Sequence, residues 1–587
     1  MRIVFTILVI LLGFHTMQAQ DSLAFQNEQN KLNVEEINQF HINQSDRFGQ
    51  FSLSNEGAAI QQMIFAPTSD RLGFKSNGYQ AYIRNNKNFP FSRYDRFTRV
   101  SYMPANDEGQ FISAYHSQQF KQLSFAIDYS KIISQGFFIN QNTRHASTSI
   151  MVKYHPEKSR YSAKAYARYN TISALENGGL ASDSLYVNEA FNNEKVYPVR
   201  LSNAKIEQWN TSLNLEQYYD LRKSTPFANY SYLSLRSNYQ SQEELYTDGD
   251  PDFQANVEGT ILDNYYPNIL DPNQTYDSIG FQTFGHQLDW NYGIKALMDA
   301  KIGYGFQWDN FTTGFKRENQ DRRALSLDID VLKSLVKFKL KSEHSNLFND
   351  RRDSWLLASQ IVKDFEVGYE VKERFPELVM RSYVGNHLEW INDFKTTEAH
   401  AIYALVKDKK RKFSIRANYY KLYNWIYYNS VALPEQADEV QDLIQVQVSK
   451  NFKVGNWHST VQAVWQNTES DVLRVPDWLT RIRLYYQDVI FGKNDLQVGA
   501  QVNYFSAYRA PSYMAATSVF YIGEEKEVGD YPMVDLFLNV RVKSLKAFLR
   551  YENINGLFSD RDVFVAPHYT WKEPRVKFGL TWNFYDQ

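Results

Sequence analysis

The stretch RVKFGLTWNF, residues 575–584, carries the clearest structural signal in the chain and stands three residues before its end. Large apolar side chains occupy every second position, at Val576, Phe578, Leu580, Trp582 and Phe584. A period of two predicts a β-strand with one apolar and one polar face. An aromatic strand at the C-terminus suits a barrel, because such a strand can close the sheet against the first strand.

The same alternation returns along much of the chain in segments of about ten residues, the length that a tilted strand needs to cross a bilayer. Residues 287–296, 365–372 and 496–504 are examples. A soluble β-sandwich also alternates, but its strands usually have about five or six residues. Tyr, Trp and Phe often end the segments here, as in the aromatic girdles of a membrane barrel.

Connections between these segments alternate in length. Short turns are expected near 117–119, 155–160, 220–227, 298–300, 332–334, 407–411, 452–456, 489–495 and 543–546, and long loops at 171–206, 240–282, 420–440, 506–531 and 554–571. Membrane barrels have short periplasmic turns and long external loops. The sequence therefore predicts an all-β protein, a single closed antiparallel transmembrane β-barrel with an even number of about 18–22 strands over residues 96–587.

The composition excludes several other classes of protein. The 587 residues are 16% aromatic at a mean hydropathy of −0.52, which does not suit a large helical core. The 64 Lys and Arg residues nearly balance 66 Asp and Glu residues, so no excess of positive charge points to nucleic acid. Cysteine is absent, which rules out disulfides, thiolate metal sites and cysteine nucleophiles.

The N-terminus has the pattern of a secretory signal peptide over residues 1–20. Arg2 precedes an apolar run at 3–14, and the small residue Ala19 offers a cleavage position. A membrane anchor would need about 20 apolar residues. Residues 21–95 are then expected to form a periplasmic segment, rich in Asn and Gln, that partly enters the lumen.

Several motifs resemble those of the putative porin family of Bacteroidota outer membranes. They are PFSRY at 90–94, SQGFFINQ at 134–141, ENGGL at 176–180 and PRVKFG at 574–579. The resemblance implies a location in the cell outer membrane, contact with lipid and lipopolysaccharide, and passage of small polar solutes. The terminal strand also resembles the signal by which the barrel-assembly machinery recognises its clients.

Signatures of catalysis are not found. The sequence has no HExxH, GxSxG, Walker or GxGxxG motif, and its histidines are scattered, so we expect neither an enzyme nor a cofactor. The acidic loop 241–282 contains Asp248, Asp250 and Asp252 at the spacing of calcium ligands. Phe253 and Gly259 stand where an EF-hand needs Gly and Glu, and a solvated acidic loop is the preferred interpretation.

Polar faces of the strands are expected to line the lumen. The residues assigned to it are Lys164, Arg168, Glu366, Glu370, Arg416, Arg481, Arg483, Gln497, Gln501, Asn503, Arg541 and Lys577. On the last strand, Phe578, Leu580, Trp582 and Phe584 are expected to face lipid. The mixed signs predict weak ion selectivity in a water-filled path, or ion-paired packing that fills it.

A passive diffusion channel is the favoured function, and a non-conducting accessory barrel that acts in a protein complex through its loops is the alternative. Barrels of about 22 strands are usually plugged. If that count holds, the loops 171–206 and 240–282 or the segment 21–90 must narrow the lumen. The basic turn at 407–412 is expected to be a solvated hairpin tip.

Overall fold

The structure of the protein is a computed structural model that describes residues 48–67, 77–83, 96–104, 109–156, 159–221, 228–294, 297–314, 316–333, 336–345, 353–490, 492, 494–559 and 561–585. The signal peptide predicted at residues 1–20, with its cleavage position at Ala19, lies outside the described residues. So does the first part of the segment that begins at residue 21.

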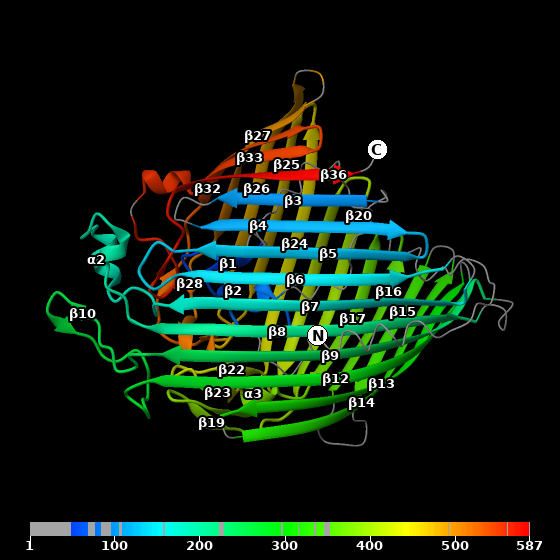
Figure 1. Cartoon of the computed structure of the whole chain (residues 1–587), viewed down its shortest axis with the longest axis horizontal. Helices are drawn as coiled ribbons and strands as arrows, with labels where there is room; N and C mark the ends of the chain where they lie inside the picture. Colours follow the sequence, from blue (N-terminus) through cyan, green and yellow to red (C-terminus); the bar gives the residue numbers. More distant parts are fainter. Residues whose placement is uncertain are drawn as a thin grey trace.

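The described residues form one closed antiparallel barrel of 22 strands (Figure 1). Each wall strand pairs with the next along the chain, from β3 to β36. The last strand, β36 (Arg575–Tyr585), then pairs with the first, β3 (Arg96–Pro104), from Tyr585↔Phe97 to Leu580↔Tyr102. The closed all-β barrel and its even strand number are confirmed.

The remaining wall strands have the following bounds. They are β4 (Gln110–Phe120), β5 (Leu123–Ser134), β6 (Thr143–Tyr154), β7 (Tyr161–Glu176), β8 (Ala204–Asp220), β9 (Tyr230–Asp248), β12 (Thr275–Ile294), β13 (Met298–Thr313), β14 (Lys316–Lys333), β15 (Val336–Ser345), β16 (Asp353–Val362), β17 (Phe365–Arg374), β20 (Thr397–Asp408), β21 (Phe413–Tyr423), β24 (Gln441–Val454), β25 (Trp457–Asn467), β26 (Trp478–Ile490), β27 (Asn494–Phe505), β32 (Met533–Val542) and β33 (Leu545–Glu552).

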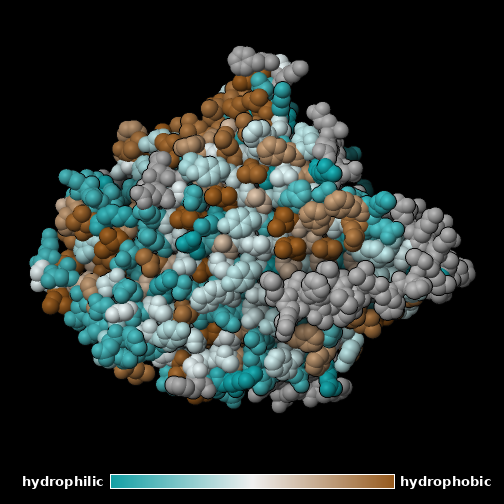
Figure 2. Space-filling view, in the orientation of Figure 1, coloured by the Kyte–Doolittle hydropathy of each residue, from teal (hydrophilic) through white to brown (hydrophobic). Residues whose placement is uncertain are grey.

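Side chains on the strands alternate between the two faces of the wall. On β36, Phe578 and Trp582 are 48% and 51% exposed, whereas Lys577 is 4% exposed. Apolar side chains thus cover the outer face, and polar ones are enclosed. In Figure 2, brown and tan residues lie among pale ones over the wall, while hydrophilic colours dominate the end at the left, where α2 (Asp183–Val187) lies.

The two ends of the barrel differ, and we call them the turn end and the loop end. At the turn end, hairpins such as β4–β5 and β32–β33 are joined by two residues, with Lys121 and Lys543 at positive φ. At the loop end, the longest connections are 177–203, 249–274, 375–396, 424–440, 506–532 and 553–574, and shorter ones join β3 to β4, β5 to β6, β13 to β14, β15 to β16 and β25 to β26. The predicted alternation of short and long connections is present, although loop 375–396 was not anticipated.

Some predicted loops are shorter in the structure because the strands continue past the apolar band. β9 runs to Asp248 and β12 begins at Thr275, so strand pairing takes up both ends of the predicted loop 240–282. β12 has 20 residues, about twice what a crossing requires. Backbone pairing continues there after the apolar alternation has ended, and sequence periodicity therefore could not locate the strand ends.

Short elements fill the loop end. They are β1 (Gln50–Ser52), β2 (Ile60–Gln62), η3 (Gln80–Tyr82), η4 (Glu194–Val196), β10 (Asn256–Val257), β11 (Thr260–Ile261), α3 (Leu378–Arg381), β18 (Ser382–Val384), β19 (Glu389–Ile391), β22 (Ile426–Tyr428), β23 (Pro434–Gln436), β28 (Tyr508–Arg509), β29 (Ser512–Met514), η6 (Ala515–Thr517), β30 (Val519–Tyr521), β31 (Glu527–Val528), η7 (Ile554–Leu557), β34 (Phe564–Ala566) and β35 (Tyr569–Thr570). None of the helices in the described chain has the length and apolar character to span a membrane.

The main apolar core of the molecule lies within the loop end. Its buried members come from the N-terminal residues, such as Leu53 and Met63, from the long loops, such as Tyr197 and Tyr513, and from the adjoining ends of wall strands, such as Phe505. In Figure 1, β1 and β2 appear behind the front wall, within the outline of the barrel. The loops fold inward onto the N-terminal residues and close this end.

Candidate functional site: the lumen

Residues 48–67 and 77–83, which we call the inner segment, contact strands from different sectors of the wall. Their partners lie on or beside β6, β9, β25 and β36. Hydrogen bonds join Thr143 to Glu56, Asn77 to Glu244, Phe65 to Gln466, and Glu56 to Lys577. A segment that touches the wall in all of these sectors lies inside the barrel, so it narrows the lumen.

A buried group of charges fastens the inner segment to the last strand. Glu56 Oε1 lies 2.9 Å from Lys572 Nζ, 2.5 Å from Arg575 Nη2 and 2.6 Å from Lys577 Nζ. Burial alone would raise the pKa of Glu56, but the charges of Lys572, Lys577 and Arg575 lower that pKa well below its usual range. Glu552 completes the group, with Oε2 at 2.9 Å from Arg575 Nε and 2.8 Å from Lys577 Nζ.

The next residue, Gly57, allows a close approach to β6. Thr143 Oγ1 donates to Glu56 O at 2.5 Å, and His145 Nε2 lies 2.6 Å from Gly57 O. Gly57 has φ +83°, and a Cβ placed on it would lie 2.5 Å from Thr143 Oγ1. Glycine is required at this position because its φ is positive and because there is no space for a side chain next to Thr143.

Two buried glutamines hold the inner segment on the side of β24 and β25. Gln466 bonds to main-chain atoms of Met63 and Phe65, and Gln445 bonds to Phe65 O. Both glutamine side chains are fully buried. The inner segment is thus held by charge at residue 56 and by main-chain hydrogen bonds near residue 65.

His568 joins three of the long loops above the inner segment. Its Nδ1 lies 3.1 Å from Asp183 Oδ1 and its Nε2 lies 2.9 Å from Glu524 Oε1. Burial lowers the pKa of His568, but the hydrogen bonds with Asp183 and Glu524 outweigh it and raise the pKa above its ordinary value. Lys526 also pairs with Asp183. The loops therefore hold each other through a charged junction.

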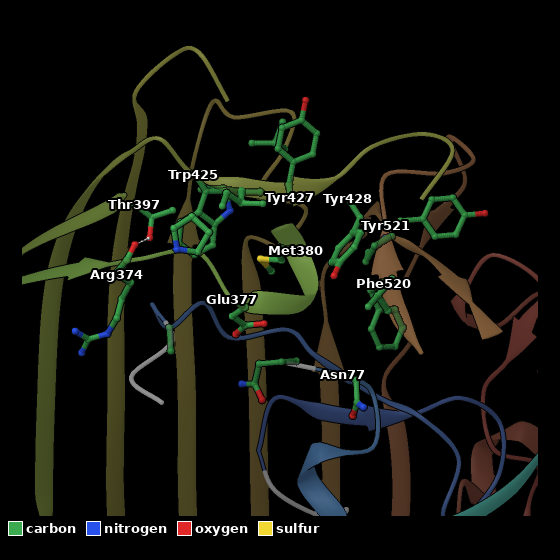
Figure 3. Close-up of a pocket in the computed structure, with 18 of the residues that line it drawn as sticks. Asn77, Arg374, Glu377, Met380, Thr397, Trp425, Tyr427, Tyr428, Phe520 and Tyr521 are labelled. Atoms are coloured by element: carbon green, nitrogen blue, oxygen red, sulfur yellow. Dashed lines mark hydrogen bonds between the residues drawn. The ribbon is translucent and has the colours of Figure 1, made fainter. Parts of the chain in front are cut away.

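A cavity of about 450 Å³ remains between the inner segment, the loops and the wall (Figure 3). In Figure 3, Trp425, Met380 and Tyr428 lie beneath the loops, Asn77 stands on the inner segment below, and Arg374 lies beside the wall strands. Its size is typical of pockets for small ligands, which take about 300–1,000 Å³. Its lining includes charged side chains of both signs, Asp309, Arg322, Arg374, Glu377 and Arg474.

The residues that the sequence assigned to the lumen carry polar contacts along the wall. Lys164, Arg168, Gln497, Gln501, Asn503 and Lys577 are at most 5% exposed. Lys164 Nζ lies 3.7 Å from Glu216 Oε2, and Arg481 Nε donates to Asn503 Oδ1 at 2.7 Å. On the enclosed face, Lys164 is thus matched by a carboxylate, Arg481 by an amide and Arg168 by the ring of Tyr166.

The other residues predicted to line the lumen also contact neighbouring side chains. The two acids accept hydrogen bonds, Glu366 from Tyr403 at 2.9 Å and Glu370 from Trp355 Nε1 at 2.8 Å. Arg416 Nε donates to Asn418 at 2.8 Å, and Arg541 pairs with Asp495. Arg483 lies over the Phe537 ring, 4.7 Å from its centre. On the opposite face of the last strand, Leu580 and Phe584 are 47% and 45% exposed, close to the values for Phe578 and Trp582.

The calcium candidates do not come together as ligands. Asp248 accepts hydrogen bonds from Asp250 N and Tyr266 OH, Asp250 accepts from Ser202, and Asp252 accepts from Asn264. Within the described residues, no three His, Asp or Glu side chains are grouped so as to hold a metal ion. Asp248 and Asp252 instead bind residues of the same loop, and Asp250 connects it to Ser202 of the neighbouring loop.

Sequence reasoning missed the residues that organise the lumen. Glu56 lies in a polar stretch without periodicity, and its basic partners are more than 500 residues away. Gln445 and Gln466 occupy ordinary polar positions of alternating strands. The pattern places them on the enclosed face, but nothing in it shows that they hold the inner segment.

Comparison with known proteins agrees with the fold. A sequence model of the family described as putative porin matches residues 21–586. No curated protein matches the chain. A closed barrel of this size, with that family match, implies the outer membrane as its location.

Solved structures with the same fold include three receptors. The ferric-catecholate import receptor Fiu from K12 E. coli has a TM-score of 0.61 at 11% identity, covering 92% of this chain and 93% of that chain. The siderophore receptors PirA and PiuA from Acinetobacter baumannii each have a TM-score of 0.57, at 10% and 11% identity. The PirA match covers 84% of this chain and 81% of that chain, and the PiuA match covers 84% and 82%. At these identities the likeness establishes the shared fold only.

Proposed function

The chain belongs to the putative porin family, and on that premise we propose that it is an outer-membrane channel through which small polar solutes diffuse passively. The observation that carries the proposal is the cavity of about 450 Å³ beside the inner segment. It lies between the loops, the inner segment and the wall, and charged side chains of the wall, such as Arg322 and Arg374, line it.

We further propose that the loop end faces the outside of the cell and the turn end faces the periplasm. Short turns on the periplasmic side and long loops outside are the rule for such barrels. The exposed apolar side chains of the wall, such as Leu580, would then contact lipid, and the loops would lie among lipopolysaccharide. Solutes would enter between the loops and pass along the inner segment.

Conductance of the purified full chain in planar bilayers tests this proposal. We expect discrete steps with weak preference between anions and cations, because the enclosed faces mix both signs. Glu56→Gln should enlarge the steps, since it weakens the attachment of the inner segment to Lys577. Glu258→Gln, at an exposed residue of the β10–β11 turn, is the matched control and should leave the steps unchanged. A correctly folded barrel without steps in any of these forms contradicts the proposal.

A second candidate function is a non-conducting barrel that acts in a protein complex through its loops. The extensive apolar core at the loop end favours it, because a dry core excludes the water that diffusion requires. Purification from native membranes in mild detergent separates the two functions. A diffusion channel should come out alone or as a homo-oligomer, whereas an accessory barrel should bring a defined second protein in fixed proportion.

A further inference from the structure

Phe65 of the inner segment lies in an apolar pocket of the wall that is separate from the main core. The pocket is formed by buried residues of β20, β21 and β24 with one loop residue, namely Ala399, Ala401, Tyr420, Leu422, Leu443 and Leu473. The Phe65 ring lies 5.3 Å from the Tyr420 ring, edge to face, and 5.8 Å from the Trp425 ring. Phe65 itself is 9% exposed. Such aromatic packing suits a large apolar anchor.

The main chain on both sides of this anchor is held by two glutamine side chains. Gln466 Nε2 donates to Met63 O at 2.6 Å, and Gln466 Oε1 accepts from Phe65 N at 3.1 Å. Gln445 Nε2 donates to Phe65 O at 2.9 Å and to Gln466 Oε1 at 3.2 Å. A side-chain amide offers a donor and an acceptor, as a peptide group does. The two glutamines thus bond to residues 63–65 as a neighbouring strand would.

None of these hydrogen bonds involves a side chain of the inner segment. Any extended peptide presents the same N–H and C=O groups, so only the aromatic side chain at the position of Phe65 is selected. Recognition of main-chain atoms together with a pocket for one side chain is how proteins commonly bind extended peptides. The wall therefore has the chemistry of a peptide site.

The cavity described above continues from this pocket. Phe65 and Ala66 form part of its lining, together with Trp425, which also packs against Phe65. The cavity therefore borders Phe65, whose main chain is held by Gln445 and Gln466. A second chain has room to lie there next to the residues that hold Phe65.

We propose that Gln445, Gln466 and the pocket around Phe65 form a binding site for short extended peptides with an aromatic side chain, and that residues 63–66 are its exchangeable occupant. A tethered occupant acts at an effective concentration near the millimolar range, so an added peptide competes well only when the occupant is weakened.

Fluorescence anisotropy of the full chain in detergent tests the site. The ligand is a labelled synthetic peptide with the sequence of residues 62–67, blocked at both ends. We expect the Phe65→Ala protein to bind it at least tenfold more tightly than the unchanged protein. The same peptide with Ala in place of Phe should bind the Phe65→Ala protein at least tenfold more weakly. Adding Gln466→Glu, which removes the Nε2 donor, should abolish binding.

Equal binding of both peptides, or no binding by a folded Phe65→Ala barrel, would show that residues 63–66 are a fixed anchor and overturn the proposal. If Phe65→Ala does not fold, the unchanged protein is used with a peptide that carries a photoreactive phenylalanine at millimolar concentration. Cross-links should then map to β21 and β24, next to Tyr420 and Leu443, and cross-links elsewhere or none would overturn the proposal. Neither measurement needs a bilayer, so peptide binding and conductance are decided separately.

Discussion

Glu56 and Lys577 are 521 positions apart in the sequence, and their side chains are joined by a hydrogen bond of 2.6 Å. The contact fastens the first described part of the chain to the strand that closes the barrel. Both side chains are almost fully buried. Removing one partner of a buried ion pair typically costs about 3–5 kcal/mol, because it leaves the other charge uncompensated.

We therefore expect Glu56→Ala to release the inner segment while the wall stays folded. Arg575 and Lys577 would keep Glu552 as an acidic partner, and the segment would lose its buried ion pairs with the last strand. Limited proteolysis should cut the inner segment at least tenfold faster, while the heat-modifiable mobility of the barrel on gels stays unchanged. Glu258→Ala, at an exposed turn, should change neither. Unaltered protection of the inner segment in Glu56→Ala contradicts the role of this ion pair.

Gly57→Ala tests the close approach to β6 with a matched control. Both Gly57 and Gly259 have positive φ, at +83° and +89°, but only Gly57 has atoms within 4 Å of the added methyl group. Backbone strain alone costs about 1–2 kcal/mol in each variant. Gly57→Ala should additionally push the segment away from Thr143 and lower its protection from proteases. Gly259→Ala should not, and equal effects would mean that the contact with Thr143 adds nothing.

An engineered disulfide can hold the inner segment in place. Ser54 Oγ lies 3.4 Å from Thr570 Oγ1 on β35, and the chain has no other cysteine. Ser54→Cys with Thr570→Cys should form a bond that stabilises the closed loop end by about 2–4 kcal/mol. The conductance steps of the oxidised double variant should be no larger than those of the unchanged protein. After treatment with a reducing agent, the steps should have the size seen for the unchanged protein. Each single variant serves as a control that responds to neither treatment.

The junction at His568 predicts a dependence of loop packing on pH. In the folded protein the pKa of His568 is raised above 6.5. The stabilisation that charged His568 gives to the loop packing is therefore complete below pH 6.5, and it is lost as the pH rises through the folded pKa. The pKa values of Asp183 and Glu524 are lowered by their contacts, first with His568, although burial opposes the shift. The stabilisation from ionised Asp183 is complete above pH 3.8, and that from ionised Glu524 above pH 4.5. Both are lost as the pH falls through the lowered folded pKa values. The junction should thus be strongest between pH 4.5 and 6.5.

Proteolysis of the loops at pH 5.5 and 8.5 measures this dependence. The unchanged protein should be cut faster at pH 8.5, after correction for the activity of the protease on a reference peptide. His568→Gln keeps a hydrogen-bonding group but cannot become charged, so its loops should be cut at similar corrected rates at both pH values. A pH dependence that survives in His568→Gln would assign the effect to other groups.

A charge on the outer face of the last strand tests contact with lipid. Leu580 is 47% exposed on β36, and Leu270 is 65% exposed in a long loop. Arginine near the middle of a bilayer costs about 2–4 kcal/mol, and near its edge about 0–1 kcal/mol. Leu580→Arg should therefore lower the unfolding free energy in lipid vesicles, whereas Leu270→Arg should not. Equal effects of the two substitutions would argue against lipid contact at Leu580.

The wall could be predicted from the sequence because its signal is local. Phe578, Leu580 and Trp582 alternate with polar residues, and the period of two follows directly from strand geometry. Strand ends were harder to place, since pairing of β9 and β12 continues up to Asp248 and from Thr275, where the apolar residues Ile279 and Phe281 lie on the enclosed face instead of the exposed one. Where the apolar face ends, the sequence no longer distinguishes a strand from a loop.

Entry of the N-terminal segment into the lumen was among the predictions, but the contacts that hold it there could not be predicted, because they join distant parts of the chain. The polar stretch around Glu56 has no period, and Gln466 looks like any other enclosed polar residue of an alternating strand. Their roles arise from pairs more than 400 positions apart. A sequence pattern describes one element at a time, and these residues act only when the barrel has closed around the inner segment.

The bond between Glu56 and Lys577 also constrains biogenesis. A chain exported with its N-terminus first delivers the residues around Glu56 long before β36, so those residues must wait for their partner until export is nearly complete. Since the partner belongs to the strand that closes the wall against β3, the bond can form only after β36 has been delivered. Fastening of the inner segment at Glu56 is therefore, like closure of the barrel, a late event of export.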